Sequence, residues 1–375
     1  MTSETPRGQS PLGAPGGRAN ESAALADTEP LPIAAFDYSL PPELIAQAPA
    51  EPRDSARLLV IPRDGGPLRH DIFRHLGRYL APGDLLVLNR TRVLPARLVG
   101  HRADTGRARV ELLLLRPERA GVWEALGRPG RRLRPGTPLV FGAGLLRAEV
   151  VARTAHGTLQ VRFVPPEILP LLDQVGQVPL PPYIRGWQGA PERYQTVYAD
   201  TPGSAAAPTA GLHFTPELLA ALQAQGIGVA YLVLHVGLDT FRPVVEEDAR
   251  AHRMHQEYCS VPDEVVGAIA AARARAGRVI AVGTTVVRAL ETAALAAERH
   301  GTALASYTGW TDLYITPGYR FRAIDGLITN FHLPRSTLLL LVSALIGRER
   351  LLAAYAEAIA HRYRFYSFGD ATLIL

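Results

Sequence analysis

The chain has 375 residues, 47% of them hydrophobic and 20% charged, which is enough to bury a large core and to form two domains. All 40 basic residues are arginine and the formal net charge is +5, which suits a polyanionic partner, although the coding bias of a GC-rich genome also explains the absence of lysine. The only cysteine, Cys259, excludes an intramolecular disulfide and a cysteine-rich zinc site, and no apolar run approaches the roughly 20 residues of a membrane helix.

The N-terminal segment 1–32 is rich in Gly, Pro, Ser and Ala and lacks the apolar core of a signal peptide. We therefore expect a disordered tail on a cytoplasmic protein without membrane segments. Order should begin near Ile33, with a helix started by proline after Phe36, a short strand over 56–62 and helical turns over 71–80.

Between residues 83 and 164 the pattern changes to short apolar segments separated by Gly, Pro and Arg, with no helical periodicity. Short strands at regular spacing with turn residues between them are typical of a small antiparallel barrel or sandwich. We therefore predict a small antiparallel β-barrel domain at 83–164, inserted into a large α/β domain formed by 33–82 and 165–375.

The stretch 207–236 predicts the central unit of the α/β domain, namely a loop, a short helix and a buried strand. Thr215 suits the N-cap of the helix and Gly226 its end, and the apolar run that follows is typical of a strand covered on both faces. His213 and His235 flank this unit, at positions where α/β proteins tend to keep their chemistry.

A second turn of interest follows the predicted strand 278–283. The strand ends at Gly283, and a helix starts directly after it at Thr284 and Thr285. Free backbone N–H groups and the helix dipole at such a turn favour an anion, although an ordinary turn capped by threonine explains the pattern as well. The remaining predicted elements are helices at 168–175, 262–276, 335–346 and 350–363 and strands at 312–315, 322–328 and 371–375.

Two polar segments allow more than one interpretation. Arginine, tyrosine and glutamine alternate over 193–198, which suits stacking on a nucleobase but also packing of the loop on its own domain. His252, His255 and Cys259 raise the question of a metal, but no nearby residue completes a zinc geometry, so we predict no metal site.

Eleven stretches occur in the order of one known family: FDYSLPPELIAQAP, RDSARLLV, PGDLLVLNRTRVLPARL, LPPYI, RYQTVYA, APTAGLHFT, HVGLDTFRPV, MHQEY, GTTVVRALE, ITNFHLPRSTLLLLVSAL and YRFYSFGDATLI. From about Phe36 to its C-terminus the chain thus resembles the S-adenosylmethionine:tRNA ribosyltransferase-isomerases of queuosine biosynthesis. It departs from the usual family pattern at Val286, where a serine is expected.

This resemblance implies a large α/β domain with a β-barrel insert, in agreement with the change of pattern at residue 83. It also implies transfer and isomerisation of the ribosyl moiety of S-adenosylmethionine onto 7-aminomethyl-7-deazaguanine at the wobble position of a tRNA. The product would be epoxyqueuosine, with release of adenine and methionine. S-adenosylmethionine is then a co-substrate, no cofactor is required, and we expect a monomer.

In the reaction that the resemblance implies, a base removes a proton from the ribose carbon next to the sulfonium, and adenine leaves as the ribose opens. The aminomethyl nitrogen of the tRNA captures the aldehyde, and ring closure with epoxide formation expels methionine. Because the pKa of histidine lies near neutrality, the acid–base work is assigned to His213, His252 and His255, with Glu257 orienting or sharing protons. The alternative is that each histidine merely satisfies a buried hydrogen bond.

The binding roles follow from position in the chain. The anionic end of S-adenosylmethionine, or alternatively a tRNA phosphate, is assigned to Gly283, Thr284, Thr285 and Arg288. Base recognition is assigned to Asn330, His332 and Arg335, stacking to Tyr194, Gln195 and Tyr198, and phosphate contacts to Arg90, Arg92 and Arg97. A non-catalytic tRNA-binding module and a methyltransferase are the rival functions, and only the predicted enzyme releases adenine.

Overall fold

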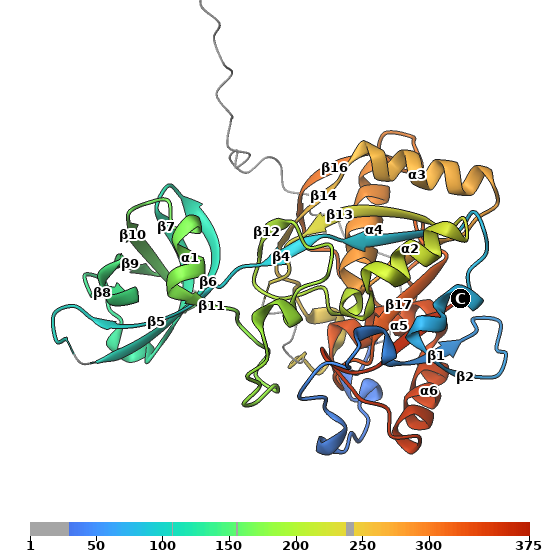
Figure 1. Cartoon of the computed structure of the whole chain (residues 1–375), viewed down its shortest axis with the longest axis horizontal. Helices are drawn as coiled ribbons and strands as arrows, with labels where there is room; N and C mark the ends of the chain where they lie inside the picture. The colour runs from blue at the N-terminus through green and yellow to red at the C-terminus, as the bar shows by residue number, and fades with distance from the viewer. Residues whose placement is uncertain (1–29, 107, 155–156, 238–243) are drawn as a thin grey trace, which may run out of the picture.

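The computed structural model describes residues 30–106, 108–154, 157–237 and 244–375. A β-barrel stands to one side of a larger α/β body (Figure 1). The predicted fold class, a large α/β domain with an inserted small antiparallel barrel, is therefore confirmed. Most of the predicted tail and the residues 238–243 of one family-like stretch lie outside the described residues.

The body is built on a nine-stranded sheet with the order β16-β14-β13-β3-β15-β17-β18-β1-β2. Neighbouring strands run parallel from β13 through β3 and β15 to β17, and antiparallel pairs flank this centre. The strands are β1 (Arg57–Ile61), β2 (Arg69–Ile72), β3 (Leu85–Asn89), β13 (Gly228–Leu234), β14 (Glu257–Val261), β15 (Val279–Val282), β16 (Tyr307–Thr311), β17 (Gly326–Asn330) and β18 (Ala371–Ile374).

Helices cover both faces of this sheet. Leu85 and Val87 of β3 pack into one core with residues of α3, α4, α5 and α6, whereas Leu86 and Leu88 pack into a second core with α2. Burial on both faces explains why the central strands are continuous apolar runs without alternation. The helices are α2 (Pro216–Ala224), α3 (Asp263–Ala274), α4 (Thr284–Glu298), α5 (Thr337–Ile346) and α6 (Arg348–Ala360).

The central unit predicted over 207–236 is present. The side chain of Thr215 caps α2 by accepting a hydrogen bond of 3.1 Å from the backbone N–H of Leu218. Gly226, with a φ of 81°, turns the chain out of the helix in a conformation that glycine adopts readily. The strand that follows, β13, is an inner strand of the sheet and runs parallel to β3.

The inserted barrel closes because β5 pairs with β8 as well as with β6. Its antiparallel strands are β5 (Arg97–Arg102), β6 (Arg109–Arg119), β7 (Val122–Arg128), β8 (Pro138–Phe141), β9 (Leu146–Arg153) and β10 (Leu159–Val164), followed by helix α1 (Leu169–Val175) and the short strand β11 (Gly176–Gln177) beside β5. Residues that alternate along these strands point inward and form one separate apolar core.

The boundaries of the insert differ from those predicted. Every residue of β3 is buried, and the strand lies in the sheet of the body, so the predicted start at residue 83 is too early. At the other end, α1 and β11 pack on the barrel, which therefore spans 97–177. The strand predicted at 312–315 is also displaced, since the edge strand β16 covers Tyr307–Thr311.

Two short strands lie in the polypeptide that links body and barrel. β4 (Thr91–Val93) pairs in parallel with β12 (Thr201–Ser204) in a sheet of their own. Within the described part of the chain, no helix is both long and apolar enough to cross a membrane.

Candidate active site

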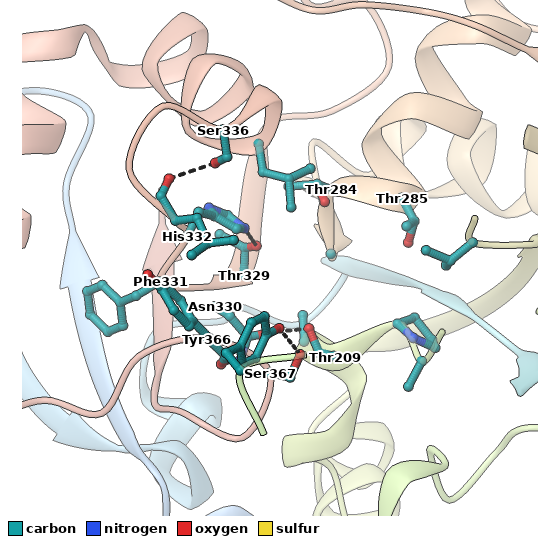
Figure 2. Close-up of a pocket in the computed structure, with 18 residues that line it drawn as sticks. Thr209, Thr284, Thr285, Thr329, Asn330, Phe331, His332, Ser336, Tyr366 and Ser367 are labelled. Atoms are coloured by element: carbon teal, nitrogen blue, oxygen red, sulfur yellow. Dashed lines mark hydrogen bonds between the residues drawn. The ribbon is translucent and has the colours of Figure 1, made fainter. Parts of the chain in front are cut away.

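A pocket lies at the carboxyl ends of the parallel strands β13, β15 and β17. It has an empty volume of about 610 Å³, its open mouth included. Val236 follows β13, Gly283 follows β15, and the loop 331–333 follows β17, which ends at Asn330. The 3-10 turn η8 (Thr209–His213) and the segment 366–367 complete the wall (Figure 2). This edge of an open parallel sheet is where α/β proteins bind their ligands.

Two helices begin at this pocket. Thr284 and Thr285 form the first turn of α4, and Ser336 is the N-cap of α5, where its hydroxyl accepts a hydrogen bond of 3.2 Å from the N–H of Leu339. Gly283 precedes α4 with a φ of 96°, a backbone conformation that favours glycine. Helix N-termini present unpaired N–H groups and positive partial charge, so the arrangement favours an anion.

Asn330 ties three segments of the pocket wall together. Its Oδ1 accepts a hydrogen bond of 2.9 Å from Thr209 Oγ1, and its Nδ2 donates one of 3.1 Å to the carbonyl of Tyr366. Tyr366 adopts a φ of 71°, which is costly for a residue with a side chain and is held here by the surrounding contacts. The amide of Asn330 therefore fixes the shape of the wall.

His332 contributes a neutral imidazole to the pocket. Its Nε2 lies 3.1 Å from Thr329 Oγ1, and its backbone N–H donates a hydrogen bond of 3.0 Å to the hydroxyl of Tyr355. Burial lowers the pKa of His332 to about 3, because the charged form loses its hydration. At neutral pH the ring is thus an uncharged hydrogen-bonding group.

An aromatic pair forms another part of the wall. The rings of Tyr183 and Tyr366 lie 4.9 Å apart between centroids, and the hydroxyl of Tyr183 is 2.7 Å from Ser367 Oγ. Burial raises the pKa of Tyr183 to about 12, so the phenol stays protonated. Fixed aromatic rings of this kind suit contact with a planar base.

Asn89, the last residue of β3, is hydrogen-bonded to one of the lining residues of the pocket. Its Nδ2 donates hydrogen bonds to the carbonyl of Leu234 at 2.9 Å and to Thr285 Oγ1 at 3.4 Å, and its Oδ1 accepts one of 3.1 Å from the N–H of Leu234. One buried amide thereby couples the ends of two neighbouring strands to the first turn of α4.

Five of the residues predicted from the sequence line this pocket: Gly283, Thr284, Thr285, Asn330 and His332. Val286, at the position where the family usually has serine, points instead into the apolar core, so the missing hydroxyl is not a loss to the pocket wall.

His213 does not reach the pocket. Its ring is buried and stacks on Phe73 at 5.0 Å, and its two nitrogens face the carbonyl oxygens of Ala210 at 3.1 Å and Gly369 at 2.9 Å. Burial lowers the pKa of His213, although the two carbonyl oxygens act in the opposite direction. These contacts match the alternative that this histidine satisfies buried hydrogen bonds.

Arg288 does not line the pocket either, contrary to the predicted contact with the anionic end of the substrate. Its guanidinium forms a buried ion pair with Glu257 and donates to the carbonyl of Leu313 at 3.0 Å. Glu257 also accepts a hydrogen bond of 2.7 Å from the N–H of Gly237. The positive charge of Arg288 is therefore already compensated inside the protein.

The other two predicted acid–base histidines lie outside the lining residues of the pocket as well. His252 Nδ1 is 3.0 Å from Glu246 Oε2, and the ring of His252 packs against Tyr314 at 5.6 Å. His255 is exposed. The structure therefore does not gather the three predicted histidines around one pocket.

The predicted stacking residues turn inward. Tyr194 is fully buried and packs edge-on against Phe368 at 5.7 Å, and Gln195 binds both the N–H and the carbonyl of Val93 at 2.9 Å. Tyr198 packs against Tyr231, with 5.4 Å between ring centroids. These side chains do not line the pocket, so the platform predicted from composition is wrong in its location.

The remaining predicted arginines each have a carboxylate partner. Arg335 pairs with Asp37 and lies beside a different hollow. The other three ion pairs are Arg90 with Asp200 at 3.6 Å, Arg92 with Glu192 at 2.6 Å and Arg97 with Glu111 at 2.8 Å. Neutralised in this way, they are weaker candidates for phosphate contacts than the sequence suggested.

In the described part of the chain, one group of side chains is close enough to share a metal ion. It consists of His70, Glu357 and His361, whose ligand atoms lie within 4.8 Å of one another. None of the three lines the pocket, and the chemistry of the pocket itself consists of hydroxyl, amide and aromatic groups.

Comparison with known proteins agrees with this architecture. Residues 33–374 match the family described as "Queuosine biosynthesis protein". The chain is 57% identical to the S-adenosylmethionine:tRNA ribosyltransferase-isomerase of Moorella thermoacetica, over 92% of this chain and 99% of the relative. It is 54% identical to the protein of the same name from Pelotomaculum thermopropionicum, over 91% of this chain and 98% of the relative.

A solved structure is similar over its whole length. It is the crystal structure of the S-adenosylmethionine tRNA ribosyltransferase from Thermotoga maritima, which is 40% identical in sequence. The superposition has a TM-score of 0.52 and covers 91% of this chain and 100% of that chain.

Proposed function

This chain belongs to the queuosine biosynthesis protein family, and from that premise we propose that the pocket at the carboxyl ends of β13, β15 and β17 binds S-adenosylmethionine. The chain is an S-adenosylmethionine:tRNA ribosyltransferase-isomerase, a transferase of tRNA modification. It moves the ribosyl moiety of S-adenosylmethionine onto 7-aminomethyl-7-deazaguanine at the wobble position of tRNA, giving epoxyqueuosine, adenine and methionine. The convergence of two helix N-termini on one hydroxyl-lined pocket supports this choice of site most strongly.

The methionine carboxylate of the donor is placed at the start of α4. The backbone N–H groups of Thr284 and Thr285 belong to the first turn, where a helix offers donors without intrahelical partners. The helix dipole adds roughly 0.3–1 kcal/mol of attraction for a negative group at this end. The sequence analysis assigned carboxylate binding to the same turn together with Arg288. The present proposal leaves out Arg288, because its guanidinium is paired with Glu257.

The sulfonium of the donor is placed toward His332. Because burial keeps this imidazole neutral at pH 7, it does not repel the positive sulfur. Proton removal next to sulfur, expulsion of adenine and capture of the ribose by the tRNA nitrogen follow in the order that the family resemblance implies. Support for this site comes from the pocket lining, which offers hydroxyl and amide side chains as hydrogen-bonding groups.

The planar group, either adenine or the extruded tRNA base, is placed against Tyr183 and Tyr366. A base that reacts with an enzyme must leave its stack, and an aromatic wall replaces the lost stacking contacts. Asn330 holds the carbonyl of Tyr366 and so positions this wall rather than contacting the base directly.

We propose further that the protein acts as a monomer in the cytoplasm. Support for the location comes from the substrates, since tRNA and S-adenosylmethionine are cytoplasmic molecules.

The test is incubation of the purified protein with S-adenosylmethionine and tRNA that bears 7-aminomethyl-7-deazaguanine. We expect adenine and methionine in equal amounts and a modified nucleoside of the mass of epoxyqueuosine, detected by mass spectrometry. Thr285→Val should raise the KM for S-adenosylmethionine, whereas Thr308→Val, the same change on the exposed edge strand β16, should not. Formation of S-adenosylhomocysteine without adenine would refute the proposed reaction.

A further inference from the structure

The inserted barrel holds the whole excess of positive charge of this protein. Residues 97–177 contain 13 arginines and seven Asp or Glu residues, which gives a formal charge of +6. The complete chain has a formal charge of +5, so the other 294 residues together are at −1. An excess of positive charge in one domain is typical of proteins that bind nucleic acid through that domain.

Several carboxylates of the barrel are already used by neighbouring arginines. Glu111 binds Arg97, Asp104 binds Arg102 at 2.5 Å, and Glu124 binds Arg116 at 2.7 Å. The positive charge that remains is therefore concentrated on other arginines of the barrel.

Four exposed arginines lie within the short segment 128–134, whose sequence is RPGRRLR: Arg128, Arg131, Arg132 and Arg134. Among the described residues, no carboxylate lies within ion-pair distance of any of them. The segment forms the 3-10 turn η5 (Gly130–Arg132) after β7, and Leu133 fixes it by inserting into the barrel core.

A fifth guanidinium lies against the same turn. Arg153 of β9 donates hydrogen bonds from Nη2 to the carbonyl oxygens of Gly130 at 2.7 Å and Leu133 at 3.2 Å. These acceptors carry no net charge, so they orient Arg153 without neutralising it. We name Arg128, Arg131, Arg132, Arg134 and Arg153 the arginine turn.

Most of the arginine turn lies at the carboxyl end of β7 and in the segment that follows it. Strands β6 and β7 form a hairpin. Near the connection between them, the guanidinium of Arg116 in β6 lies 6.0 Å from the ring of Trp310 in β16 of the body. Glu124 of β7 is opposite Arg116 in the sheet, and Arg128 is the last residue of the same strand. At about 3.3 Å per residue, the four-residue step from Glu124 to Arg128 along β7 spans roughly 13 Å, and η5 follows Arg128 in the chain. Figure 1 shows β7 in the barrel, beside the body.

We propose that the arginine turn binds the sugar–phosphate backbone of the substrate tRNA outside the anticodon stem-loop whose base enters the pocket. The inference rests on the proposed function, which places the wobble nucleotide in the body. Guanidinium groups bind phosphate oxygens through two parallel hydrogen bonds, and a rigid turn loses little entropy when it does so. Such contacts supply affinity that depends on salt rather than on base sequence.

The test compares two triple variants of equal charge. One variant carries R131Q, R132Q and R134Q in the arginine turn. The control variant carries R275Q, R299Q and R348Q at exposed positions of the body. Binding of full-length precursor tRNA and of the isolated anticodon stem-loop is measured by fluorescence anisotropy over a series of KCl concentrations. Circular dichroism and thermal unfolding confirm that both variants are folded.

We expect the arginine-turn variant to bind full-length tRNA at least tenfold more weakly and to reduce the slope of log K against log salt by about 3. The control should stay within twofold of wild type, and both variants should bind the stem-loop normally. Equal loss in the control, normal tRNA binding by the arginine-turn variant, or equal loss on the stem-loop would overturn the proposal. Adenine release by the wild-type protein separates this outcome from failure of the proposed function, because that reaction does not depend on where the tRNA body lies.

Discussion

Replacement of Arg288 by methionine distinguishes a structural role of this residue from contact with the substrate. The structure pairs Arg288 with Glu257 in the interior, where both side chains are almost inaccessible to solvent. Removing the guanidinium leaves a buried carboxylate without its counter-charge, which costs roughly 3–5 kcal/mol. For a domain of this size, a loss of that order lowers the melting temperature by about 6–20 °C.

The double variant E257Q/R288M makes the prediction specific. It removes both charges, and the amide of glutamine keeps an acceptor for the N–H of Gly237, which Glu257 binds at 2.7 Å. Most of the lost thermal stability should therefore return. The KM for S-adenosylmethionine, measured at saturating tRNA, should stay within about threefold of wild type in the double variant. The reasoning fails if Arg288→Met melts within 2 °C of wild type while its KM rises more than tenfold.

Three further predictions concern pH, backbone conformation and the histidines outside the pocket. The pKa of His332 is lowered from 6.5 to about 3 in the folded state. Below pH 6.5 the unfolded chain therefore binds a proton that the folded chain does not, and the free energy of unfolding decreases as the pH is lowered. Urea unfolding should show that His332→Gln removes about 2 kcal/mol of the stability difference between pH 7 and pH 5, whereas the exposed control His300→Gln should remove none. Gly283→Ala places a side chain at a φ of 96° and should raise the KM for S-adenosylmethionine at least fivefold with kcat little changed, and an unchanged KM would separate this turn from the substrate. His252→Gln and His255→Gln should each release adenine within threefold of the wild-type rate, and a loss of a hundredfold or more would restore the acid–base role assigned from the sequence.

Local patterns in the sequence predicted those residues of the candidate pocket that depend on local structure. Gly283, Thr284 and Thr285 were found because a buried strand, a glycine and a helix start are consecutive in the chain, and their geometry follows from that order. The capped helix at Thr215 was predicted for the same reason. In both cases the residues that determine the structure are within a few positions of one another.

Residues that meet only through the tertiary fold were missed or misassigned. Tyr183 and Tyr366 form one wall of the pocket from distant parts of the chain, and no local pattern marks them as partners. Tyr194 was mistaken for a surface platform because composition does not reveal which side of a loop faces the core. Arg288 follows the first turn of α4 by one helical turn, but its side chain meets β14 instead of the pocket.

Domain boundaries were limited by a similar ambiguity. The five residues of β3 have the length of a barrel strand, and their place in the sheet of the body becomes apparent only when β13 and β15 pair with them. A continuous apolar run, in contrast to the alternation seen in β9, was the available signal that this strand belongs to the parallel sheet.

The location of the donor is tested most directly by a crystal structure of the protein with S-adenosylmethionine bound. We predict the methionine carboxylate within hydrogen-bond distance of the backbone N–H groups of Thr284 or Thr285, and the ligand inside the wall formed by Asn330, His332 and Tyr366. S-adenosylmethionine bound elsewhere, with this pocket free of ligand, would contradict the account.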